Sequence, residues 1–334
     1  MTRRPLPRPL LLPLVPLYAA GVALQSWLAG RASAVRLRSP VVSVGSLSAG
    51  GAGKTPFVIA LGELLRRNGV AVDVLSRGHG RTSTETLRVD AAGDAAMFGD
   101  EPLLIARRLA CAVYVARERV LAGRMAETDR STLRQPAALH LLDDGFQHRR
   151  LHRTVDLVLL TAEDVADTLL PAGNLREPLR TLQRATVLVL RADEADLLRP
   201  MIASWFAGPV WVIERHFGFV EGSASARPLA FCGIARPDNF YRSLADAGVQ
   251  PVDFVAGKDH QIYDDAAIAK LVQRAGASGA DGFVTTAKDA VKLTAAHRRT
   301  LATIGPLAVG DVQVTLREET KCVAQLRAML GSNL

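Results

Sequence analysis

The sequence has few cysteines, and none of them lies near another. Cys111, Cys232 and Cys322 form no CxxC pair among the 334 residues. This spacing argues against a disulfide framework and a cysteine-based zinc site, and it favours a reducing compartment. Internal repeats and low-complexity tracts are also absent. Since 49% of the residues are hydrophobic, the composition is that of a globular protein, and the length allows two domains.

Acidic residues are absent from the first 38 positions, which carry six arginines. The net charge of the whole chain is +8, so most of the positive excess lies in this segment and the remainder is nearly balanced. A nucleic-acid-binding protein would carry that excess on its folded domain, so we expect no nucleic-acid partner. Arginines that flank an apolar run favour a surface of anionic lipid instead.

Charged residues are also absent from Leu10 to Gly30. This length just reaches that of a membrane-spanning helix, but two prolines interrupt its first third. A secretory signal with a cleavage site at 32–34 is a second interpretation, and a buried helix of a soluble protein is a third. We favour a fourth, an interfacial anchor, because Tyr18 and Trp27 suit headgroup depth. Export would also separate the chain from the ATP that the next motif requires.

Beyond residue 38, short apolar runs alternate with helix-like stretches. The runs are apolar on both faces, which predicts an α/β fold with a parallel sheet covered by helices on both sides. The expected strands lie at 41–46, 71–76, 112–116, 139–143, 155–160, 186–190, 210–216, 229–232, 252–255 and 282–285.

A segment of mostly small residues, EGSASA at 221–226, marks the expected domain boundary. We predict an anchoring segment at 1–38, a nucleotide-binding domain at 39–220 and a smaller α/β domain at 221–334. The last helix of the smaller domain is allowed to pack back on the first domain.

The strongest chemical signal is the segment SAGGAGKT at 48–55. Its glycines let successive backbone N–H groups turn toward phosphate oxygens, a lysine reaches the β- and γ-phosphates, and a threonine offers a hydroxyl to Mg²⁺. A predicted strand precedes the segment and a predicted helix follows it, although a serine replaces the first glycine of the usual pattern. We predict a nucleoside triphosphate site made of Ser48, Ala49, Gly50, Gly51, Ala52, Gly53, Lys54 and Thr55.

Two carboxylates, Asp143 and Asp144, end the apolar strand at 139–143. In phosphate-loop proteins such a strand end holds part of the Mg²⁺ shell. The alternative is an ordinary turn, because Asp-Gly is a common turn pair. With the phosphate loop present, we favour the metal role.

Three other patterns are ambiguous on their own. Asp100 opens a GDEP segment that reads as a helix cap, and the pair Asp259–His260 reads as a loop. His148 and His152 have helical spacing, but metal binding would need a third ligand. For that basic cluster, a surface for anionic lipid or phosphate is favoured over plain solvated surface.

Together these segments resemble the tetraacyldisaccharide 4′-kinase family, which phosphorylates the lipid A precursor in Gram-negative bacteria. The match covers nearly the whole chain, and a serine or threonine at the first loop position is usual in that family. The motifs that carry it are VGSLSAGGAGKTP at 44–56, LSRGHGR at 75–81, GDEP at 99–102, LDDGFQHRRLHR at 142–153, LLPAGNLREPL at 169–179, FCGIARPDNF at 231–240, DH at 259–260 and TTAKDAVKL at 285–293.

The resemblance implies that the γ-phosphate of MgATP goes to the 4′-hydroxyl of a tetraacylated disaccharide 1-phosphate, which gives lipid IVA. It implies a monomer at the cytoplasmic face of the inner membrane, with ATP and Mg²⁺ as cofactors. Asp100 would activate the hydroxyl in a dyad with His260, assisted by Lys54. The implied metal group is Thr55, Asp143, Asp144 and Glu177, and the implied substrate and phosphate group is Ser76, Arg77, Gln147, Asn174 and Arg176.

Two rival interpretations remain. A phosphate-loop GTPase or ATPase that acts as a chaperone or switch would share the nucleotide site, but the only trace of a guanine-reading NKxD tetrapeptide is the partial match at 287–289. A non-enzymatic membrane scaffold would leave the loop and the acidic strand end unexplained. Because Asp100 and His260 fall on opposite sides of the expected boundary, we also hypothesise that domain closure assembles the site and excludes water.

Overall fold

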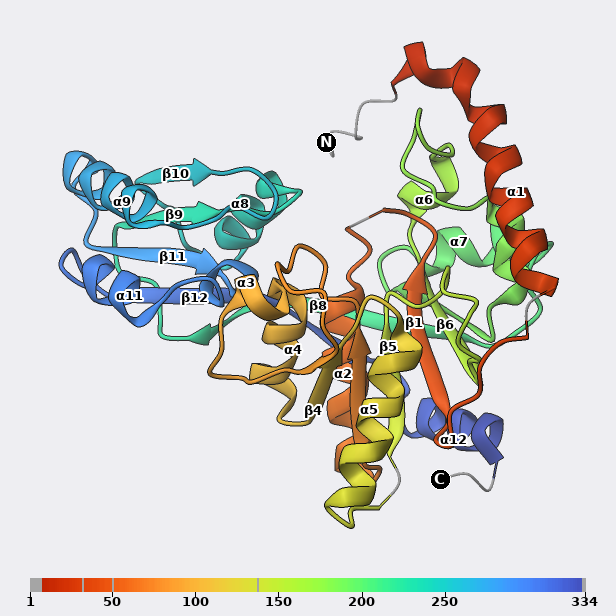
Figure 1. The fold of residues 1–334 in the computed structure, drawn as a ribbon. Helices are drawn as coiled ribbons and strands as arrows, with labels where there is room; N and C mark the ends of the chain where they lie inside the picture. The colour runs from red at the N-terminus through yellow and green to blue at the C-terminus, as the bar shows by residue number, and fades with distance from the viewer. Residues whose placement is uncertain (1–7, 32, 50, 137, 332–334) are drawn as a thin grey trace.

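The structure is a computed structural model that describes residues 8–31, 33–49, 51–136 and 138–331. Its strands form one twelve-stranded sheet in the order β10-β9-β11-β12-β8-β7-β6-β1-β5-β2-β4-β3 (Figure 1). The strands are β1 (Val41–Ser46), β2 (Val72–Ser76), β3 (Leu87–Arg88), β4 (Ala112–Val115), β5 (Leu139–Asp143), β6 (Val155–Leu160), β7 (Val187–Arg191), β8 (Val210–Glu221), β9 (Pro228–Cys232), β10 (Asp253–Ala256), β11 (Gly282–Thr286) and β12 (Leu307–Leu316).

Helices cover both faces of this sheet, as the apolar strands predict. The α-helices are α1 (Val15–Arg31), α2 (Lys54–Arg67), α3 (Ala95–Phe98), α4 (Asp100–Leu109), α5 (Arg119–Thr132), α6 (Ala162–Ala166), α7 (Ala195–Ile202), α8 (Pro237–Asp246), α9 (Asp265–Ser278), α10 (Ala287–Ala290), α11 (Ala295–Leu301) and α12 (Glu319–Leu330). Two 3₁₀ helices, η1 (Pro9–Leu14) and η2 (Leu179–Arg184), complete the described elements.

The first lobe consists of β1 to β7 with α2 to α7 and α12. Its central strand β1 is fully buried and pairs in parallel with β5 and β6. Parallel strands place their carboxyl ends at one edge of the sheet, so the chain leaves β1 and β5 close together. The predicted acidic strand end therefore lies next to the predicted phosphate loop.

The second lobe consists of β9, β10, β11 and the start of β12, with α8 to α11, and extends to the left in Figure 1. It has its own apolar clusters, centred on Phe231 and Phe283 in one case and on Phe240 in the other. A long antiparallel pairing of β12 with β8 continues the sheet into the first lobe. The predicted domain boundary falls at the end of β8 and stays a prediction.

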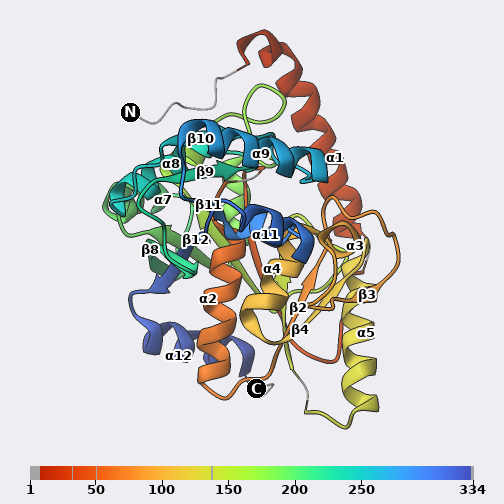
Figure 2. The same ribbon diagram turned by 90° about the vertical axis from the view of Figure 1, so that its left-hand side faces the viewer.

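The chain returns to the first lobe through α12, which lies beside α2 in Figure 2. Cys322 and Leu326 of α12 belong to the main apolar core, and Glu319 lies 3.2 Å from Arg67 of α2. Helix α12 therefore packs back on the core of the first lobe, beside α2.

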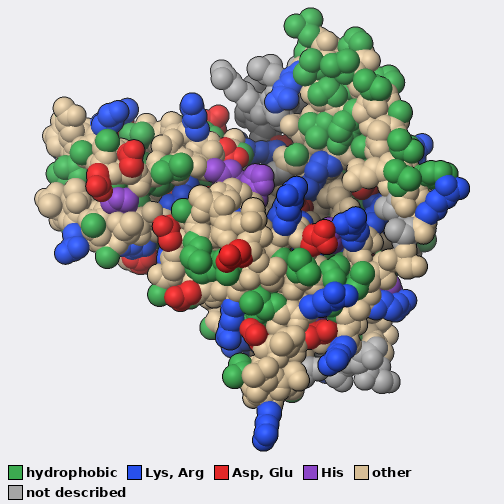
Figure 3. All heavy atoms as spheres, viewed as in Figure 1, with side chains coloured by type: hydrophobic (Ala, Val, Ile, Leu, Met, Phe, Trp, Pro, Cys, Tyr) green, Lys and Arg blue, Asp and Glu red, His purple; other side chains and the backbone are tan. Residues whose placement is uncertain are grey.

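The N-terminal helix α1 stands along one side of the first lobe with its apolar surface uncovered (Figures 1 and 3). Pro13 lies in η1 and Pro16 in the first turn of α1, where proline is tolerated. Leu17 is 73% exposed, and the window 9–28 is long and apolar enough to cross a membrane, with none of it buried. The described residues therefore exclude a buried core helix here.

Candidate active site

The phosphate loop joins β1 to α2, as the motif predicts. Gly51 and Gly53 have φ values of 78° and 84°, a left-handed region that favours glycine. Lys54 opens α2, and its Nζ donates to Ser46 Oγ at 3.1 Å and lies 3.5 Å from Asp144 Oδ1. Gly50 lies outside the described residues. The loop thus places two left-handed glycines and a lysine at the end of a buried strand, a conformation in which successive backbone N–H groups can face phosphate oxygens.

A second loop, residues 167–178, supports the phosphate loop. The backbone N–H of Ala49 donates to Asn174 O at 2.9 Å, and the Arg176 guanidinium donates to Ser48 O at 3.1 Å. The side chain of Asn174 donates to Asp167 within this second loop. The backbone of Asn174 therefore holds the phosphate loop in place. Its side chain does not line the cavity that lies between the two lobes.

The two carboxylates at the end of β5 have different environments. Asp143 is buried; its Oδ2 accepts from Ser76 Oγ at 3.1 Å, and its Oδ1 has no partner among the described residues. Burial, followed by the charges of Glu101 and Asp144, raises the pKa of Asp143 to about 7. Ionising Asp143 is therefore costly until a cation faces it.

Asp144 has a φ of 49° and turns its carboxylate toward cations. Burial opposes ionisation, but Arg176 and Lys54 hold the pKa of this carboxyl well below its usual range. The Arg176 guanidinium bonds both carboxylate oxygens, at 2.9 and 2.8 Å. Asp144 thus stays ionised and orients the two cations that stand beside the phosphate loop.

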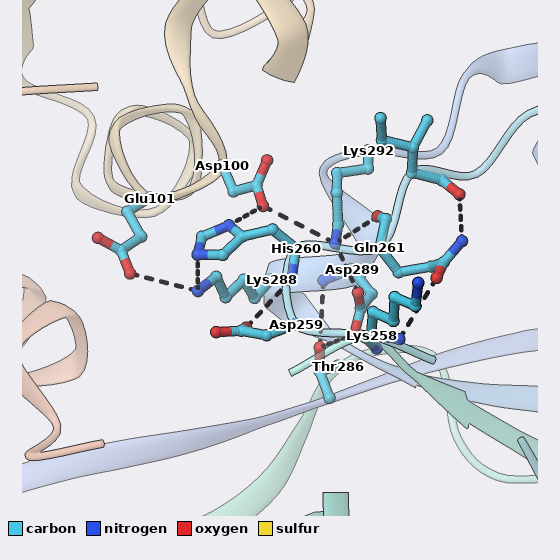
Figure 4. Close-up of polar contacts among 12 residues, drawn as sticks. Asp100, Glu101, Lys258, Asp259, His260, Gln261, Thr286, Lys288, Asp289 and Lys292 are labelled. Carbon is cyan, nitrogen blue, oxygen red and sulfur yellow. Dashed lines mark hydrogen bonds and ion pairs between the residues drawn. The ribbon is translucent and has the colours of Figure 1, made fainter. Parts of the chain in front are cut away.

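Asp100 and His260 are brought together from different lobes. Asp100 begins α4, where an acidic residue is stabilised by the helix N-terminus, and His260 lies in the loop after β10. His260 Nδ1 lies 3.1 Å from Asp100 Oδ2 (Figure 4). This places a carboxylate–histidine pair at the mouth of the nucleotide site.

Two lysines of the second lobe surround this pair, because α10 packs against α4. Lys288 Nζ lies 3.5 Å from His260 Nε2 and 3.4 Å from Glu101 Oε1, and Lys292 Nζ lies 3.8 Å from Asp100 Oδ2 (Figure 4). An ammonium group donates and cannot accept, so Nε2 is the accepting nitrogen and Nδ1–H donates to Asp100. Lys288 thereby fixes the tautomer that keeps Asp100 an acceptor.

Sequence reasoning missed one member of a cationic cluster on another wall of the same cavity, which also contains Arg77 and His148. Arg119 is 8% exposed, at the start of α5, and its Nε has no partner among the described residues. Burial and the nearby Arg77 lower the pKa of Arg119, and burial with Arg119 and other arginines lowers the pKa of His148 to about 4. An arginine in the first turn of a helix opposes the helix dipole. The position of Arg119 at the start of α5 is therefore the one signal in the sequence that could have pointed to its role.

These groups line one cavity of about 780 Å³ between the lobes. Histidine and basic side chains gather around the hollow beside the second lobe in Figure 3. Predicted site residues on its wall are Ala49, Gly51, Ala52, Gly53, Lys54, Thr55, Ser76, Arg77, Asp143, Asp144, Gln147, Arg176 and His260. Asp100 meets this wall through its contact with His260.

Glu177, a predicted metal ligand, is not brought to this wall. Its carboxylate pairs with Arg184, and burial raises its pKa. The Arg176 guanidinium bonds Asp144 and the phosphate loop, whereas the Glu177 carboxylate accepts from Arg184. The metal role predicted for Glu177 is therefore not supported by the arrangement.

The family model for tetraacyldisaccharide-1-P 4′-kinase matches residues 7–331. The chain belongs to this family. A tetraacyldisaccharide 4′-kinase of Koribacter versatilis is 44% identical over 294 residues, which cover 84% of this chain and 88% of the relative. The Aquifex aeolicus member is 35% identical over 273 residues, covering 77% and 80%. The family resemblance seen in the sequence is thus confirmed.

A solved member of the family shares the fold. The "apo" form of LpxK from Aquifex aeolicus in complex with ATP is 30% identical and matches with a TM-score of 0.76, covering 97% of this chain and 99% of that chain. The phosphate-loop α/β fold with an apolar N-terminal helix is therefore also confirmed.

Proposed function

We propose that this protein is an ATP-dependent lipid kinase that phosphorylates the 4′-hydroxyl of a tetraacyldisaccharide 1-phosphate. The observation that carries the proposal is the cavity that joins a phosphate loop to the Asp100–His260 pair. The relatives are named for the same reaction, and one of them was solved with ATP. Each part of the cavity has a place in this transfer.

The phosphate loop and its lysine would hold the triphosphate. Mg²⁺ takes oxygen ligands, usually one or two carboxylates together with substrate phosphates. The residues present fit this ion, because Asp143 offers a buried oxygen with no partner among the described residues and Thr55 lines the same wall. When bound, Mg²⁺ would neutralise charge on the β- and γ-phosphate oxygens. Asp144 would orient Lys54 and Arg176 toward the same oxygens.

The acceptor hydroxyl would enter beside Asp100. As the bond from the sugar oxygen to the γ-phosphorus forms, the bond from that phosphorus to the bridging oxygen breaks and ADP leaves. Asp100 accepts the hydroxyl proton, which typically contributes roughly 10²–10⁴-fold to the rate. His260, held by Lys288, keeps the Asp100 carboxylate oriented.

The cationic cluster would bind the acidic group of the acceptor. Arg77, Arg119 and Gln147 line the cavity away from the dyad, and they suit the 1-phosphate of a disaccharide. Ser76, predicted as a substrate contact, lines the same cavity and also supports Asp143 through its hydroxyl.

The exposed apolar face of α1 would keep the enzyme at its lipid substrate. A disaccharide with four acyl chains stays in the bilayer, so the active site has to reach the surface. We propose that α1 is an interfacial anchor on the cytoplasmic side of the inner membrane and that the protein acts as a monomer. Tyr18 of α1 donates to Arg176 O at 3.2 Å, which links the anchor to the loop that supports the phosphate site.

The surroundings of the partial NKxD match at 287–289 argue against the rival interpretation, a phosphate-loop GTPase or ATPase that acts as a switch. Asp289, the carboxylate of that match, is fully buried, accepts from Gly233 N at 2.9 Å and pairs with Lys292 at 2.8 Å. It is therefore not free to read a guanine base.

The proposal is tested by ADP release from the full chain with Mg²⁺ and ATP in lipid–detergent micelles. We expect release only when the tetraacyldisaccharide 1-phosphate is present, and loss of release in Lys54→Ala. Turnover of GTP that does not depend on the acceptor would instead support the switch-type rival.

A further inference from the structure

Arg236 of the second lobe reaches across the cavity to the phosphate loop. It is the residue that precedes α8, within the FCGIARPDNF motif, whose role the sequence leaves open. Atoms of its guanidinium lie only 3.0–3.1 Å from the position that a Cβ on Gly51 would occupy. A side chain at Gly51 would therefore press on Arg236, so the second lobe contacts the first at the middle of the loop.

We propose that Arg236 is a catalytic arginine, supplied by the second lobe, that binds the γ-phosphate of ATP during transfer. This inference rests on the proposed kinase function and adds a residue to its machinery. The charge on the phosphoryl group being transferred spreads over its outer oxygens, and an arginine that reaches them stabilises the transition state. Arg236 already stands beside the middle of the phosphate loop, at Gly51.

Two first-lobe cations beside the loop are held by a carboxylate. Lys54 and Arg176 bind the Asp144 carboxylate, which fixes them on the first-lobe side of the phosphates. Arg236 comes from the opposite side, so the two sets would enclose the phosphate between them. A bidentate guanidinium is well suited to such a group.

The present partner of Arg236 is one that a phosphate can replace. Its Nη1 lies 2.7 Å from Glu163 Oε2 of α6, and both side chains are more than one third exposed. An exposed ion pair of this kind contributes little, because water competes with it. A γ-phosphate carries more negative charge and would lie on the loop beside the guanidinium. Glu163 thus holds Arg236 close to its site until ATP arrives.

The test compares Arg236→Ala and Arg236→Lys with a matched control, Arg274→Ala. Arg274 also belongs to the second lobe and pairs with a carboxylate, Asp253, but does not line the cavity. The measurements are kcat and the KM for ATP in the micelle assay, and the dissociation constants of ADP alone and of ADP with Mg²⁺ and aluminium fluoride, a mimic of the transferring phosphoryl group. Thermal unfolding of each full-length variant verifies that it is folded.

We expect Arg236→Ala to lower kcat at least 100-fold and to remove the extra affinity for the aluminium fluoride complex, with ADP affinity within threefold of wild type. Added guanidinium ion should restore part of the activity, Arg236→Lys should retain part of it, and Arg274→Ala should match wild type. A kcat within threefold of wild type, or equal weakening of ADP and its aluminium fluoride complex, would overturn the assignment. If the wild type failed to phosphorylate the lipid, the proposed function would be wrong. The comparison of ADP with its aluminium fluoride complex would still test the role of Arg236.

Discussion

Replacing Asp143 with asparagine should stabilise the metal-free protein and abolish its activity. The carboxylate is buried, and its pKa is raised from 3.8 to about 7 by burial and by two acidic neighbours. A shift of roughly three pKa units corresponds to about 4 kcal/mol, which the ionised folded protein bears above pH 7. Asparagine has the same shape without the charge, so Asp143→Asn should recover most of this free energy.

The sign of the effect depends on pH. Below about pH 3 the carboxyl is protonated in both the folded and unfolded chain, so the two proteins should be equally stable. As pH rises from about 4 to about 7, the unfolded chain loses this proton before the folded one does, and the wild type becomes less stable. Above pH 8 the difference is constant.

The assay is denaturant unfolding of both proteins at pH 5 and pH 8.5, without Mg²⁺ or nucleotide. We expect the advantage of Asp143→Asn to grow by roughly 2 kcal/mol or more between the two conditions. Asp193→Asn removes an exposed carboxylate of the same lobe and should change stability by less than about 0.5 kcal/mol at both. An Asp143→Asn protein less stable than wild type at pH 8.5, or an advantage independent of pH, would refute the reasoning.

Three further predictions concern the dyad and the anchor. Asp100→Asn and His260→Ala should each lower kcat by roughly 10²–10⁴-fold with little change in the KM for ATP, and the double variant should be close to the worse single one; rates within about threefold of wild type would contradict the dyad. Tyr18→Phe removes the hydrogen bond to Arg176 O and should cost roughly 0.5–1.5 kcal/mol in urea unfolding, so an unchanged midpoint would show that the contact contributes nothing. Deleting residues 1–30 should weaken sedimentation with anionic vesicles and raise the KM for the lipid more than that for ATP; equal rises would argue against anchoring.

The parts of the site that are local in sequence were predictable. The phosphate loop and the acidic end of β5 follow from spacing and from the strands before them, because parallel strands end at a common edge. The family resemblance added the distant pair of Asp100 and His260, which neither segment indicates alone. The metal role of Glu177 stays a prediction, because in the structure its carboxylate pairs with Arg184.

The parts set by tertiary packing were not predictable. Arg236 looks like an ordinary surface arginine in sequence, and only the meeting of the lobes places it on the cavity. Arg119 reaches the cavity through the packing of α5 within the first lobe. The strand β12 was missed because Asp311 and Gln313 interrupt its apolar residues. Most of it pairs antiparallel with β8, and this part is only partly buried. The same pairing extends β8 to Glu221, beyond the expected end of that strand.

The central claim is that this cavity transfers phosphate from ATP to one hydroxyl of a lipid-linked sugar. It is tested most directly by locating the phosphate in the product with mass spectrometry and phosphorus NMR after reaction with ATP and Mg²⁺. The account predicts one new phosphate monoester at the 4′ position for each ADP formed, with the 1-phosphate intact, and no product in Asp100→Asn. ADP formed without a phosphorylated lipid, or a phosphate at another position, would contradict it.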